Sequence, residues 1–93
     1  MSFKEIYEKK MQTQLNELKA EIDELRVKAE QVEINLQLEY YALIDELQVK
    51  LELANQRFQS LKQAGEEDWE EFKSEFELVW NSLRELIKSV VSP

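Results

Sequence analysis

Residues 11–32 read MQTQLNELKAEIDELRVKAEQV, and this stretch decides the fold class. Its apolar residues recur in alternating steps of four and three, from Met11 through Leu15 and Leu18 to Val32. Such spacing places side chains along one face of an α-helix, whereas a strand with one buried face has a period of two. The stretch therefore predicts an amphipathic helix.

The same spacing continues through almost the whole chain and defines one apolar stripe. After Val32 the steps mix heptads with eleven-residue units, which return a side chain to the same helix face after three turns. We expect helices to associate through this stripe. Its members, here named the association stripe, are Leu15, Leu18, Ile22, Leu25, Val32, Leu36, Tyr40, Leu43, Leu47, Leu51, Phe58, Leu61, Trp69, Phe72, Phe76, Trp80 and Leu83.

Gly65 is the one residue inside this pattern that favours a helix end. A glycine after a helix, followed by Asp68 as the next N-cap, predicts a long amphipathic helix over 1–64, a turn at 65–68 and a shorter, aromatic-rich helix over 69–93. A continuous helix stays open as the alternative, because the stripe keeps its phase across the glycine and one glycine costs a helix only about 1 kcal/mol.

The unequal lengths of these two helices predict self-association. The first helix would be about 90 Å long, since a helix rises about 1.5 Å per residue, and the second could cover only part of it. An uncovered apolar stripe has to be buried against another chain. We therefore predict an all-α fold, either a long helical hairpin or an antiparallel coiled coil or helical bundle, that self-associates. Ser2 and Glu5 match a capping box at the helix start.

Composition argues against several classes of function. The 93 residues include no His and no Cys, which removes the usual general base, the commonest metal ligand and thiol chemistry. A net charge of −8 disfavours binding to nucleic acid and to anionic membranes. The longest apolar run, residues 40–44, is too short to span a bilayer. We expect a cytoplasmic protein that is not an enzyme, with no catalytic residues, metal or cofactor.

Two clusters have alternative interpretations. The acidic residues within 66–71 are interpreted as a solvated helix start that complements the helix dipole, with weak cation binding as the alternative. The aromatic residues of the last third are interpreted as helix-packing residues, with a ligand pocket, a lipid-facing stripe or a partner anchor as alternatives. Trp80 lies beside the stripe spacing that passes through Val79, so we expect it to be exposed or to anchor an interface.

Segments spread over almost the full chain carry a family resemblance. They are residues 7–11, 14–15, 20–25, 28–30, 39–40, 68–73 and 79–83. The last two, with Trp69 and Trp80 eleven residues apart, are the most specific. The pattern resembles an uncharacterised, stress-associated family of small coiled-coil proteins from cyanobacteria and proteobacteria. The resemblance implies a soluble, cytoplasmic helical protein induced by stress, with no catalytic residues to carry over.

The chain departs from that family in one segment. Leu36, Leu38, Tyr41 and Leu43 stand where family members are richer in Ala and Lys. The heavier apolar content implies a wider interface in this protein.

Three functions remain open on sequence alone. The leading prediction is a non-enzymatic, homo-oligomeric helical protein with a structural or interaction role, associated with stress. The second is an amphipathic protein of lipid or granule surfaces that resembles apolipoproteins, which also use eleven-residue units, although the net charge disfavours it. The third is an adaptor helix for a specific protein partner.

Overall fold

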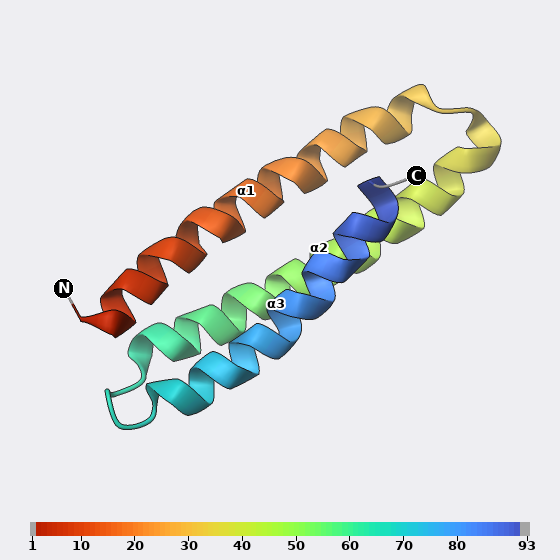
Figure 1. Cartoon of the computed structure of the whole chain (residues 1–93). Coiled ribbons are helices and arrows are strands. Elements are labelled where there is room, and N and C mark those ends of the chain that lie inside the picture. Colours follow the sequence, from red (N-terminus) through yellow and green to blue (C-terminus); the bar gives the residue numbers. More distant parts are fainter. Residues whose placement is uncertain (1, 92–93) are drawn as a thin grey trace.

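The chain folds into three helices joined by two short turns. The computed structural model describes residues 2–91, and the side chains of residues 2–90. Helix α1 spans Phe3–Gln31, α2 spans Ile34–Gln63 and α3 spans Trp69–Val91. Each helix runs antiparallel to the one before it, so α1 and α3 point the same way (Figure 1). The predicted all-α helical bundle is confirmed, whereas its self-association stays a prediction.

Helix α1 begins as its sequence predicts. Ser2 is the N-cap, and its hydroxyl oxygen accepts a hydrogen bond of 3.2 Å from the backbone N–H of Glu5. This bond satisfies one of the donors that a helix start leaves unpaired.

The single helix expected over residues 1–64 is wrong, because the chain turns at Val32 and Glu33. Val32 has an extended backbone conformation, with φ −84° and ψ 164°, and Glu33 is close to polyproline II, with φ −53° and ψ 145°. Any L-residue can adopt these angles, so the turn needs no glycine or proline. The turn brings the apolar faces of α1 and α2 together, and the apolar burial this allows outweighs the few helical hydrogen bonds that are lost.

The second turn lies at residues 64–68, where the glycine suggested one. Helix α2 ends with the N–H of Ala64 bonded to the carbonyl of Leu61 at 3.2 Å. The carbonyl of Gly65 then accepts from the N–H groups of Asp68 and Trp69, each at 3.0 Å, and α3 follows. Gly65 does not adopt the positive φ of a glycine helix cap, so the cap expected there is wrong. Ala64 instead leaves the helix in an extended conformation.

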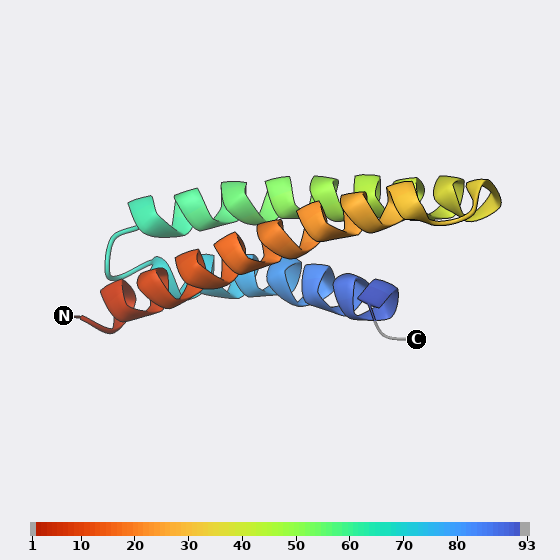
Figure 2. The ribbon, with the colours of Figure 1, turned by 90° about the horizontal axis from the view of Figure 1, so that it is seen from above.

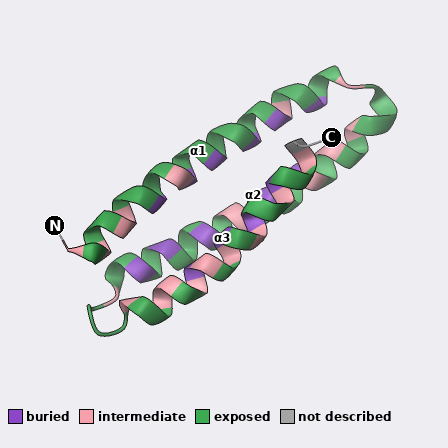
Figure 3. Cartoon of the chain, in the orientation of Figure 1, coloured by how far each residue is buried: buried purple, intermediate pink, exposed green. Residues whose placement is uncertain are grey.

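Helix α2 packs against both of the other helices. Figure 2 shows it along one edge, with α3 and most of α1 on its other side. Buried residues line the sides of the helices that face one another (Figure 3). The core is entirely apolar among the described residues and consists of Met11, Leu15, Leu18, Ile22, Leu25, Ala29, Ile44, Leu47, Ala54, Phe58, Leu61, Phe76, Trp80, Leu83 and Ile87.

Candidate interaction surface

The bundle covers most of the association stripe by itself. Ten of its seventeen residues are buried within the chain: Leu15, Leu18, Ile22, Leu25, Leu47, Phe58, Leu61, Phe76, Trp80 and Leu83. Six are half-buried: Val32, Tyr40, Leu43, Leu51, Trp69 and Phe72. Only Leu36 is exposed, at 44%. The turn at Val32 and Glu33 therefore removes the reason for which this stripe was expected to need a second chain.

Trp80 is not the exposed residue that the sequence suggested. It is 6% exposed, and its ring stacks on Phe76 with the centroids 6.1 Å apart and an interplanar angle of 18°. Phe76 in turn contacts Phe58 of α2 at a centroid distance of 5.5 Å. Trp80 thus extends an aromatic row in the core, and its neighbour Val79 is half-buried at the edge.

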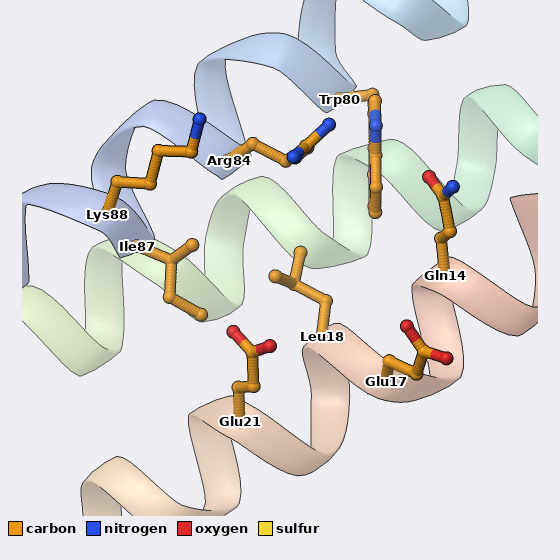
Figure 4. A pocket seen from close by; sticks show the side chains of 8 residues that line it. All are labelled: Gln14, Glu17, Leu18, Glu21, Trp80, Arg84, Ile87 and Lys88. Carbon is orange, nitrogen blue, oxygen red and sulfur yellow. The ribbon is translucent and has the colours of Figure 1, made fainter. Parts of the chain in front are cut away.

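A groove of about 320 Å³ lies between α1 and α3. Its floor includes Leu18 and Trp80, and Figure 4 shows the carboxylates of Glu17 and Glu21 on the α1 side, with Arg84 on the α3 side. The floor residues are already buried, at 5% and 6% exposure, so a partner that entered the groove would remove little more apolar surface from water. The groove is therefore a weak candidate for a docking site.

A polar and aromatic cluster joins α1 to α3 near the start of both helices. The hydroxyl of Tyr7 donates a hydrogen bond of 2.8 Å to a carboxylate oxygen of Glu77. The Nζ of Lys73 lies over two rings, 5.0 Å from the centroid of Tyr7 and 5.5 Å from that of Trp69. Burial, followed by the hydrogen bond and the negative charge of Glu77, raises the pKa of Tyr7 well above its ordinary value. This cluster fixes α1 against α3 and leaves the hydroxyl protonated.

The largest exposed apolar side chains gather on α2. Of the ten such residues among those described, six belong to this helix. Five of them form what we name the outer α2 face: Ile34, Leu38, Tyr41, Val49 and Leu53. Ile34, Leu38 and Val49 are the most open, at 78%, 79% and 68%.

Helical geometry places these five residues on one side of α2. At about 100° per residue they span roughly 120° of arc, and the arc lies opposite the core residues Leu47 and Phe58. Figure 2 shows that α2 lies along one edge of the bundle. The same arc also carries the exposed residues Asp45 and Glu52, so the outer side of α2 is mixed apolar and acidic, whereas its inner side is apolar. The outer α2 face is the strongest candidate for an interaction surface.

Sequence reasoning found this surface only in part. It singled out Leu38 and Tyr41 as unusually apolar, and it missed Ile34, Val49 and Leu53. A second apolar pattern in the sequence could have identified this surface. Leu38 and Val49 are eleven residues apart, which is the same spacing that the association stripe uses.

The described residues do not form a metal centre, since no three acidic side chains of residues 2–91 converge on a point. The acidic residues within 66–71 are all exposed. None of the three helices, as far as the chain is described, is long and apolar enough to cross a membrane.

Comparisons with protein-family models, with curated proteins and with solved structures find no match to this chain. The interpretation of its function therefore stands on the fold and on the outer α2 face.

Proposed function

We propose that this protein is a non-enzymatic helical interaction protein that associates with itself through the outer α2 face. One observation carries the proposal: apolar side chains are exposed on a helix whose opposite side is already in the core. A cytoplasmic location and the stress-linked role implied by the family resemblance belong to the same proposal.

The apolar surface on this face is large enough to matter. Burying an exposed aliphatic side chain contributes about 1.5–3 kcal/mol, so the open fractions of Ile34, Leu38 and Val49 in two copies amount to roughly 7–13 kcal/mol. Association costs about 4–15 kcal/mol in lost freedom of motion. These ranges overlap, which favours a reversible, concentration-dependent dimer over a permanent one.

The double variant Leu38→Gln, Val49→Gln tests the proposal. It replaces two exposed apolar side chains with polar ones of similar size and leaves the core untouched. Light scattering across a dilution series should give the wild type a molar mass that rises toward twice 11.1 kDa, whereas the variant should stay near 11.1 kDa.

A matched control is available on another helix. Leu78 on α3 is 75% exposed and lies outside the outer α2 face, so Leu78→Gln removes about half of that apolar area elsewhere. It should associate like the wild type. Equal masses for the double variant and the wild type at every concentration would show that the face does not mediate association.

A lipid or granule surface is the second candidate, and the exposure of Phe3 at 86% and Ile6 at 50% on α1 favours it. The acidic residues Asp45 and Glu52 on the outer side of α2 disfavour it, because charged groups are costly to bury in a bilayer. Flotation with vesicles of zwitterionic lipid separates the two. We expect the protein to stay with the soluble fraction, and co-flotation would support the lipid-surface function instead.

A further inference from the structure

The first turn joins two helices whose buried faces would lie on the same side of one straight helix. At about 100° per residue, the buried residues of α1, from Met11 to Ala29, and those of α2, from Ile44 to Leu61, would share an arc of roughly 100° if the helix continued through the turn. The turn contains neither glycine nor proline, and the side chain of Glu33 makes no capping bond. Local sequence is therefore compatible with a straight connection, and the packing of α1 on α2 selects the bent one.

We propose that the turn at Val32 and Glu33 is a hinge through which two copies of the chain exchange α1. In the exchanged form, α1 and α2 of each copy make one continuous helix, and α1 lies on α2 and α3 of the second copy. Each contact that α1 makes in the bundle, such as the hydrogen bond from Tyr7 to Glu77, is then made between chains. Exchange of an identical element is a low-cost route to a dimer, and a short hinge loop is its usual site.

The packing of α1 on α2 fixes the position of the two-fold axis. Lys4 Nζ donates to the backbone carbonyl of Lys62 at 3.2 Å, so residues 4 and 62 are neighbours, and residue 33 is midway between them in the sequence. Two continuous helices that keep this register run antiparallel and cross the axis at the hinge itself. The contacts between α1 and α2 can therefore pass from one chain to the other without a shift in register.

The exchange covers apolar surface that a single chain leaves open beside the hinge. Leu36 is the exposed member of the association stripe, at 44%, and Val32 is half-buried. In the register given above, Leu36 lies opposite Ala29 and Val32 of the second copy. The continuous helix also restores backbone hydrogen bonds that the turn interrupts. Both changes favour the exchanged dimer.

Two effects oppose the exchange. The axis brings Glu33 of the two copies together, and like charges at contact weaken an interface. Helix α1 must also leave the core before it can pack on another chain. We therefore expect the single-chain bundle at low concentration, and the exchanged dimer when the protein refolds from denaturant at high concentration.

Two substitutions at one residue test the hinge. Glu33→Ala favours the continuous helix, because alanine has the highest helix propensity. Glu33→Pro fits the bent chain, since Glu33 has φ −53° and Val32 before it is extended, but proline interrupts a continuous helix. Both variants lose the same charge, so they differ in the hinge alone. After refolding at high concentration, light scattering should detect several-fold more dimer for Glu33→Ala than for Glu33→Pro, which should stay near 11.1 kDa.

Cross-linking shows which chain supplies α1, because the chain contains no cysteine of its own. Lys4→Cys and Lys62→Cys are introduced together, both with the native hinge and with Glu33→Ala, and the separated monomer and dimer are treated with a short bis-maleimide. The dimer should be joined covalently between chains, whereas the monomer should be joined within one chain.

The outcomes separate this inference from the proposed function. All these variants also carry Leu38→Gln and Val49→Gln, so the outer α2 face does not contribute, and the dilution series of native protein tests that face independently. Equal dimer fractions for Glu33→Ala and Glu33→Pro, or a dimer joined only within its chains, would overturn the exchange. If Glu33→Pro loses its helical circular dichroism, Glu33→Gly takes its place with the same expected order, because glycine also disfavours a continuous helix.

Discussion

Tyr7 shows how one side chain holds two helices together, through a bond to Glu77, which is 70 residues away in the sequence. Its hydroxyl donates to Glu77, and its ring contacts Trp69 at a centroid distance of 6.1 Å. The buried contacts between helices are apolar and can slide, whereas a hydrogen bond to a carboxylate has a defined geometry. A second part-buried hydrogen bond, from Lys50 Nζ to Ser82 Oγ at 2.9 Å, joins α2 to α3. Tyr7 therefore sets the position of α1 against α3.

Replacing Tyr7 with Phe removes the hydrogen bond and keeps the ring. We expect Tyr7→Phe to lower the free energy of unfolding by about 1 kcal/mol at neutral pH, measured by urea denaturation. Unchanged stability would show that the bond to Glu77 contributes nothing.

The raised pKa of Tyr7 adds a pH dependence of known sign. Above about pH 10, the ordinary pKa of tyrosine, the phenol ionises in the unfolded chain while the folded chain keeps its proton. The unfolded state then binds fewer protons, so stability falls as pH rises. The wild type should lose stability relative to Tyr7→Phe above pH 10, and Tyr40 and Tyr41 cancel in this comparison because both proteins contain them. A constant difference between pH 8 and pH 11 would contradict the assigned environment.

At the scale of the helices, the sequence predicted the helical faces better than the number and the ends of the helices. The spacing from Met11 to Ala29 identified the buried face of α1 residue by residue. The turn at Val32 and Glu33 could not be predicted in this way, because neither residue favours a helix end. Its driving force is the packing of α1 on α2, which local sequence does not encode.

Helix α3 shows a second limit of periodicity. The steps Phe76, Val79, Leu83 and Phe76, Trp80, Leu83 are both compatible with a helix, and they differ only in how the helix is rotated about its axis. The structure buries Trp80, and the contact with Phe76 and Phe58 explains why. The sequence could therefore predict that α3 has an apolar face, but not which of two overlapping faces meets the core.

The first turn offers a stabilising substitution. Glu33 is the N-cap of α2, and its side chain makes no capping hydrogen bond. Aspartate caps a helix well with its shorter side chain, so Glu33→Asp should raise the free energy of unfolding by about 0.5–1 kcal/mol without a change in charge. Thermal or urea unfolding measures the effect. A loss of stability would mean that α2 does not begin at this residue.

The second turn offers an independent test. Gly65 has no positive φ, and a Cβ placed on it would meet nothing within 4 Å. Gly65→Ala should therefore stabilise the protein by about 0.4–1 kcal/mol, because alanine restricts the unfolded chain more than glycine does. If the variant is instead destabilised, Gly65 needs the left-handed conformation that a glycine helix cap would use.

At the scale of the whole molecule, the two turns allow one chain to bury its core without a partner. The bundle measures 51 × 20 × 20 Å and buries within one chain most of the stripe that seemed to require a partner. The apolar surface left over lies on the opposite side of α2, where the core does not need it. An isolated chain can thus fold by itself, and the proposed self-association through the outer α2 face would add to a bundle that is already complete.

Small-angle scattering at high dilution tests this arrangement most directly, because it measures the shape of the single chain. The two-turn bundle has a radius of gyration of 15.3 Å over its Cα atoms, and the extrapolated value should lie close to this, apart from the hydration layer. A helix that ran unbroken through Val32 and Glu33 would form a rod of about 90 Å, with a radius of gyration of about 26 Å. A measured value near the second figure would contradict the account.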